Sequence, residues 1–139
     1  MDLPFTTEQF LGVFREYNTA IWPAQVAVYL LGLGAIGLTF RRPSWSDRTI
    51  AGVLAVFWGW MGAVYHLAFF RTINPAATLF GAFFLVQGLL FVYVGVVRGN
   101  LTFRARSDLY GWVGGLLMGY ALAIYPVLGA LLGHGYPEA

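Results

Sequence analysis

The chain has 139 residues, of which 59% are hydrophobic and only 10% are charged, against about 25% charged residues in ordinary soluble domains. It contains no cysteine, which excludes disulfides, zinc–thiolate sites and iron–sulfur clusters within the chain. The formal net charge is +2. Because all the basic residues are arginines that lie outside the apolar stretches, most of them in the gaps between these stretches, this charge does not indicate nucleic acid as a partner.

The chain begins with a predicted amphipathic helix over residues 6–20. Thr6 and Gln9 have the spacing of a capping box, and Phe10, Phe14 and Tyr17 fall on one helical face. The helix is too short to cross a bilayer, so we expect it to lie in the membrane interface. The alternative is that these residues are the first turns of the first span. A proline at position 23 favours a break, since proline fits the first turn of a new helix.

Four apolar stretches follow, at residues 21–40, 49–70, 76–97 and 109–133. Each is about as long as the roughly 20 residues that cross a bilayer, and none has a charged residue in its interior. We therefore predict an all-α integral membrane protein with a single membrane domain over residues 1–139. The gaps between the stretches are short, which favours an up-down bundle of four transmembrane helices.

The distribution of arginine predicts how the spans are oriented. The gaps at residues 41–48 and 98–108 carry most of the arginines, whereas Arg15 and Arg71 lie on the other side. Cytoplasmic loops are enriched in arginine and lysine. We therefore expect the arginine-rich side to be cytoplasmic and both termini to be on the outer, periplasmic side.

Glycine and alanine recur along the predicted spans at helical spacing. Small residues let membrane helices approach closely, so these stripes predict the faces on which helices meet. One interpretation of the stripes is that they form a tight channel or a dimer face. The favoured interpretation is ordinary helix packing within one chain. The stripes are Ala27, Gly34 and Gly37 in the first stretch, Gly52, Ala55, Gly59 and Gly62 in the second, Gly81, Gly88 and Gly95 in the third, and Gly111, Gly115, Gly119 and Ala123 in the fourth.

Polar side chains gather in the outer halves of the predicted spans. Such groups mark binding sites or ion pathways in many membrane proteins, although they also serve as hydrogen bonds between helices. One outward-facing pocket is the functional hypothesis. The candidates are Gln25, Tyr29, Tyr65, His66 and Tyr125.

His66 stands at the end of the small-residue stripe of the second stretch, so we expect it to face the bundle interior. Its functional roles would be a metal or haem ligand, or a proton relay, and hydrogen bonding between helices is the alternative. Trp58 and Trp60 lie mid-span, away from the interface where tryptophan is usual. They point to different faces. The functional hypothesis for both is contact with a neighbouring chain or with a flat lipid-like cofactor, for which Trp58 is the candidate near His66, and packing in the core or against lipid is the default interpretation.

No nucleotide-binding loop, catalytic triad, carboxylate pair or metal-ligand cluster occurs in the sequence. The sequence therefore predicts a non-enzymatic integral membrane protein that is an accessory or structural subunit of a larger membrane assembly. One alternative is a small-solute transporter or channel that uses the outer polar cluster. Another is a binder of haem, quinone or a similar lipophilic cofactor near His66, Trp58 and Tyr65. The expected partners are the lipid bilayer and other membrane subunits.

Two segments of the chain resemble an uncharacterised family of bacterial multi-pass membrane proteins, a domain-of-unknown-function family. They read LPFTTEQFLGVFREYNTAIWPAQ and YHLAFFRTINPAATLFGAFFLVQGLLF. The resemblance covers nearly the whole chain and implies a bacterial inner-membrane location with no established activity. It also implies that family members continue past a pair like Tyr136-Pro137 with further spans, so this chain would be a short member or a fragment.

Overall fold

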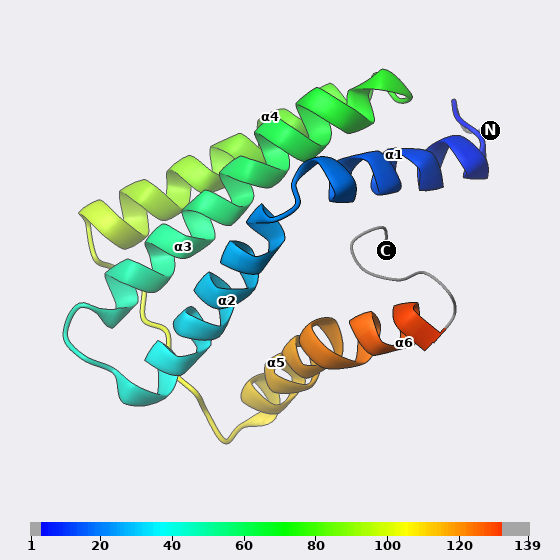
Figure 1. The fold of residues 1–139 in the computed structure, drawn as a ribbon. Helices are drawn as coiled ribbons and strands as arrows, with labels where there is room; N and C mark the ends of the chain where they lie inside the picture. The colour runs from blue at the N-terminus through cyan, green and yellow to red at the C-terminus, as the bar shows by residue number, and fades with distance from the viewer. Residues whose placement is uncertain (1–3, 132–139) are drawn as a thin grey trace.

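The computed structural model describes residues 4–131, and over this range the chain is helical with no strand (Figure 1). The described part of the chain contains four helices that are long and apolar enough to cross a membrane. The all-α prediction with four apolar spans is therefore confirmed. The elements are α1 (Thr7–Ala20), α2 (Ala24–Arg41), α3 (Ser46–Trp60), η1 (Met61–Phe69), η2 (Phe70–Thr72), α4 (Ala77–Leu90), η3 (Phe91–Val97), α5 (Leu109–Gly119), η4 (Tyr120–Ile124) and α6 (Tyr125–Leu131).

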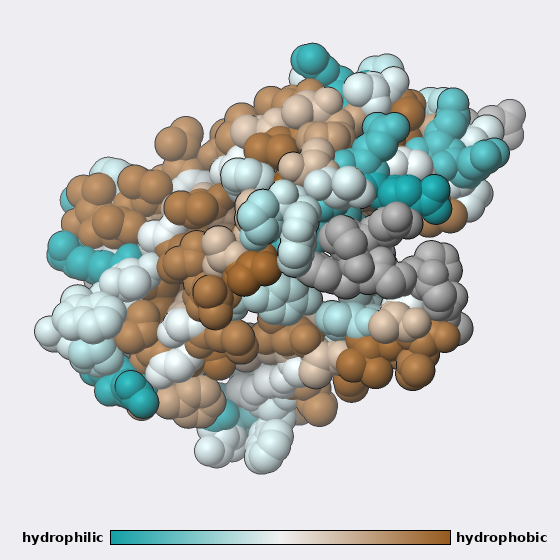
Figure 2. Space-filling view, viewed as in Figure 1, coloured by the Kyte–Doolittle hydropathy of each residue, from teal (hydrophilic) through white to brown (hydrophobic). Residues whose placement is uncertain are grey.

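The four spans lie close to their predicted positions. They are Ala24–Arg41, Ser46–Thr72, Ala77–Val97 and Leu109–Leu131, and the last two predicted residues of the fourth span lie outside the described residues. The first span begins at Ala24 rather than at the predicted residue 21, because residues 21–23 form the turn that separates it from α1. Hydrophilic side chains gather toward the ends of the helices, and hydrophobic ones cover much of the face between them (Figure 2). Membrane insertion and the side on which the termini lie stay predictions.

The α1 helix is capped as its sequence predicts. The Thr6 hydroxyl accepts a hydrogen bond from the Gln9 backbone N–H at 3.2 Å, and the Gln9 side-chain oxygen accepts one from the Thr6 backbone N–H at 2.8 Å. The helix ends at Ala20, so the alternative of one continuous first span is excluded.

The aromatic face of α1 packs along the second span. The ring of Phe10 lies 5.9 Å from that of Phe70, and the ring of Phe14 lies 5.5 Å from that of Tyr65. Further along, the Tyr17 ring makes an edge contact with Tyr65 at 5.2 Å. The apolar face that was expected to meet the membrane interface is therefore covered by η1. As a result α1 lies beside η1, while α2 packs against α3 (Figure 1).

The second and third spans form a tight antiparallel pair, which we call the central hairpin (residues 46–97). A Cβ atom added to Gly62 would lie 2.9 Å from the Gly81 carbonyl oxygen, and one added to Gly88 would lie 3.2 Å from the Ala55 carbonyl oxygen. A Cβ atom on Gly95 would collide with the Ala51 side chain. Since there is no room for a side chain at these positions, the predicted glycine seam of the third span is confirmed.

The fourth span (residues 109–131) is connected to the central hairpin through a loop rather than through a glycine seam. It follows the loop at residues 98–108, in which the Phe103 backbone N–H donates to the Asp47 carboxylate at 2.8 Å. The Asp108 carboxylate accepts from the Gly111 backbone N–H at 2.9 Å and so caps α5. A Cβ atom added to Gly115 or Gly119 would meet nothing within 4 Å. The prediction that these two glycines pack against other helices of this chain is therefore wrong for the described residues.

Candidate functional site

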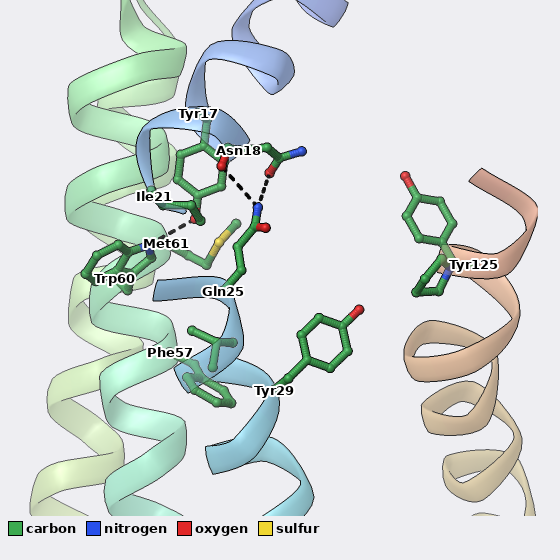
Figure 3. A pocket seen from close by; sticks show the side chains of 11 residues that line it. Tyr17, Asn18, Ile21, Gln25, Tyr29, Phe57, Trp60, Met61 and Tyr125 are labelled. Atoms are coloured by element: carbon green, nitrogen blue, oxygen red, sulfur yellow. Dashed lines mark hydrogen bonds between the residues drawn. The ribbon is translucent and has the colours of Figure 1, made fainter. Parts of the chain in front are cut away.

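A cavity of about 250 Å³ lies between α1, α2, the second span and α6 (Figure 3). Most of its lining is apolar or aromatic, and no charged side chain is among the lining residues. Trp60 stands near the middle of the second span, which has 27 residues. Gln25 lies in the first turn of α2, so the cavity extends from the start of the first span to the middle of the second span. Its walls include Tyr17, Gln25, Tyr29, Phe57, Trp60 and Tyr125.

The break between α1 and α2 builds one wall of this cavity. The Gln25 side-chain nitrogen donates to the backbone carbonyl and to the side-chain oxygen of Asn18, both at 3.3 Å. A carbonyl can only accept, so the nitrogen rather than the oxygen of the Gln25 amide must face Asn18. Its Oε1 atom is consequently a buried acceptor that has no hydrogen-bond partner within residues 4–131.

A second hydrogen bond fixes α1 to the second span at the same depth. The Trp60 indole N–H donates to the Tyr17 hydroxyl at 3.0 Å (Figure 3). Burial raises the pKa of the Tyr17 phenol above its ordinary value, and the hydrogen bond from Trp60 offsets part of that rise. The phenol therefore stays neutral at physiological pH and remains an acceptor for the indole.

Two further phenols face the cavity from different helices. Tyr29 on α2 and Tyr125 on α6 flank the space between these helices (Figure 3). Within the described residues, none of the hydrogen bonds involves either hydroxyl. The next residue, Pro126, lacks a backbone N–H, and the helix just before it is widened, with the Tyr125 N–H donating to the Tyr120 carbonyl. This local widening sets the position of Tyr125 in the wall.

The structure brings three of the six predicted site residues together and places the other three elsewhere. Gln25, Tyr29 and Tyr125 line the cavity. Tyr65 is instead covered by α1, where its ring meets those of Phe14 and Tyr17. The cluster expected around one outward-facing pocket is therefore divided, although the binding role of each residue stays a prediction.

His66 and Trp58 face α4 on another side of the second span. The His66 ring lies 4.7 Å from the Phe84 ring, and the Trp58 ring lies 4.6 Å from the same phenylalanine. The His66 Nδ1 atom is buried and has no partner within residues 4–131. Over this range no group of three His, Asp or Glu side chains could hold a metal ion. Trp58 and Trp60 do point to different faces, as their spacing predicts.

Sequence reasoning missed Tyr17, Asn18 and Phe57 as cavity residues. The sequence pattern predicts that Tyr17 and Asn18 belong to an interfacial helix, whereas Gln25 belongs to the first span. The signal that could have found them is the break at Pro23, which allows the last turn of α1 to return to the second span. Phe57 carries no polar group and gives no sequence signal of its own.

Comparison with known proteins gives one match. No curated protein matches the chain, and no solved structure matches it. The sequence does match DUF6064, a family of unknown function, over residues 7–139. This range contains all four spans and all the residues that line the cavity. The chain therefore belongs to DUF6064, a family of unknown function.

Proposed function

We propose that this chain is an integral membrane protein that acts as a subunit of a larger membrane assembly, with its fourth span as the contact surface. In this proposal the arginine-rich end of the helices faces the cytoplasm of a bacterial cell and both termini face outward. The protein carries out no reaction of its own. Its role is to hold a partner chain in the bilayer.

The membrane location is supported by the length and composition of the helices. Four of them are long and apolar enough to cross a bilayer, and large apolar side chains remain exposed along them, including Leu89 at 68% and Leu116 at 72%. In water such surfaces would associate nonspecifically. Lipid tails accept them without cost, which fits a protein whose solvent is the bilayer.

The observation that carries the subunit proposal is the bare fourth span. Not one residue of its apolar window is buried within the described chain. The first span is equally unburied but packs against α3, whereas Gly114, Gly115 and Gly119 of the fourth span have no atoms within 4 Å of where a side chain would stand. Small residues at four-residue spacing are enriched where membrane helices meet. The same kind of pattern is filled by a partner helix in the central hairpin. A helix from another polypeptide would fill it here.

Photo-crosslinking in the native membrane tests this proposal. A photoreactive amino acid is placed at position 115 on the fourth span, and a matched control carries it at position 89 on the exposed face of α4. We expect an adduct of one defined larger mass from position 115 and no such adduct from position 89. A mass of twice this chain would identify the partner as a second copy. If both positions gave only lipid adducts, the subunit proposal would be overturned.

A further inference from the structure

We propose that the cavity beside Trp60 binds the head of a neutral lipid of the quinone class, with the ring inside the cavity and the tail in the bilayer. This binding site is separate from the contact surface on the fourth span and does not rest on the subunit role. The argument uses the charge, the shape and the hydrogen-bonding groups of the cavity.

The charge of the lining selects a neutral ligand. All the lining residues are uncharged, so nothing in the wall would pair with a phosphate, a carboxylate or an ammonium group. An unpaired charge at the depth of Trp60 would be costly inside a bilayer. Phospholipid head groups and fatty-acid carboxylates are therefore poor occupants of this site.

The size and the aromatic walls select a flat ring. The cavity holds about 250 Å³, which is below the roughly 300–1,000 Å³ of sites that enclose a drug-sized molecule. It can enclose one ring but not a long chain. Phe57, Trp60 and Tyr125 stand in its walls, and aromatic side chains favour offset or edge contacts with another ring. A straight-chain alcohol would leave these faces without a matching surface.

The polar groups fit carbonyl oxygens on a ring. The hydroxyls of Tyr29 and Tyr125 come from different helices and can each donate one hydrogen bond (Figure 3). A quinone presents two carbonyl acceptors on opposite sides of one ring, so two phenol donors on different walls match it. The buried Gln25 Oε1 is an acceptor in the same wall and would suit a hydroxyl of the reduced ring.

The site also has a route from the membrane. Val28 lines the cavity from α2 and is 39% exposed, and α2 and α6 stand apart in the fold (Figure 1). An apolar tail can extend between these helices into lipid. The ligand would therefore enter laterally from the bilayer rather than from water.

Fluorescence quenching with a decyl-tailed benzoquinone tests the proposal on the full chain in lipid nanodiscs. The chain has five tryptophans, so two reporters are made in which every tryptophan except Trp60, or every one except Trp58, is replaced by phenylalanine. We expect saturable quenching of Trp60 and only weak, linear quenching of Trp58, which packs on Phe84 at another face. Linear quenching of both reporters would overturn the proposal.

Hydroxyl deletions then test the orientation of the ring. Replacing Tyr29→Phe and Tyr125→Phe together should weaken binding about thirtyfold, because two hydrogen bonds are lost. Tyr93→Phe, at an exposed tyrosine of η3, is the matched control and should leave binding unchanged. Thermal unfolding of each variant shows whether the fold is retained.

Competition with decanol tests whether the cavity recognises the ring of the quinone or accepts any apolar chain. Decanol, which has the tail and a hydroxyl but no ring, should not displace the quinone at equal concentration. Displacement by decanol, or unchanged binding in a folded double phenylalanine variant, would contradict a quinone site. Neither result would alter the crosslinking at position 115, so the two proposals fail independently.

Discussion

The central hairpin and the fourth span carry the same kind of small-residue pattern but use it differently. In the hairpin, a Cβ atom on Gly62 would lie 2.9 Å from the Gly81 carbonyl oxygen, and one on Gly81 would lie 2.7 Å from the Leu67 side chain. In the fourth span, Gly115 and Gly119 face open space. A glycine stripe therefore identifies a face on which helices can meet, whereas the helix that occupies this face depends on which segments of the chain can reach it.

The connections explain why the two regions differ. The second and third spans are joined by a turn of a few residues at 73–76, where the Asn74 side chain accepts from the Ala76 N–H at 3.0 Å. So short a turn forces neighbouring helices to lie antiparallel. The fourth span follows the longer loop at 98–108, which is fixed to Asp47 but leaves the helix beyond it apart from the hairpin.

The largest effect is expected from filling the glycine seam of the hairpin. Gly62→Leu would drive a side chain into the Gly81 carbonyl and the Leu85 backbone. Overpacking costs typically 1–3 kcal/mol, and a contact with backbone allows little relaxation. We expect a loss of about 3 kcal/mol, measured by reversible unfolding of the purified protein in mixed micelles.

The matched variant Gly115→Leu places the same side chain on the fourth span. The purified chain should change in stability by no more than about 0.5 kcal/mol, as for a surface substitution, since there is open space at this position. The same variant should lose the crosslinked adduct in native membranes. Equal destabilisation by the two leucine variants would show that the regions do not differ in packing.

A smaller effect is expected from releasing the loop that carries the fourth span. Asp47→Ala removes the acceptor of the hydrogen bond from the Phe103 N–H. A hydrogen bond to a charged group contributes about 1.5–3 kcal/mol when it is buried and less where solvent reaches it. The amide of Phe103 should exchange its hydrogen faster, while the amides of the central hairpin keep their rates. Unchanged exchange at Phe103 would show that Asp47 does not hold the loop.

The smallest effect concerns the attachment of α1 at high pH. Because burial raises the pKa of Tyr17, its neutral form is favoured in the folded state. The stabilisation is complete below the ordinary value of 10.0 and is lost as the pH rises through the raised pKa. In the Trp60 reporter, emission should shift in this alkaline range because a negatively charged phenolate forms beside the indole, whose N–H donates to the Tyr17 oxygen. The shift should be absent in Tyr17→Phe.

Much of the fold could be predicted because it depends on local sequence. Apolar length defines the spans, Thr6 and Gln9 define the start of α1, and Gly81, Gly88 and Gly95 define one face of the third span. These features require only the helical repeat and the composition of each segment.

The candidate site was predictable only in part. Sequence places Gln25, Tyr65 and His66 at comparable depths, but depth does not tell which direction a side chain points around the helix bundle. Tyr65 turns to α1 and His66 to α4 because those helices offer aromatic partners. The path of α1 after the turn at residues 21–23 likewise depends on its contact with η1, which no local pattern encodes.

The most direct test of the contrast between the two regions is a pair of distance distributions from pulsed electron paramagnetic resonance. The chain has no native cysteine, so labels can be attached at Val56→Cys with Leu89→Cys, across the hairpin, and at Val56→Cys with Leu116→Cys, between hairpin and fourth span. All three positions are exposed. For the purified chain we predict a narrow distribution across the hairpin and a broader one to Leu116, since the fourth span meets the other helices at the cavity around Tyr125. Two equally narrow distributions would contradict the account.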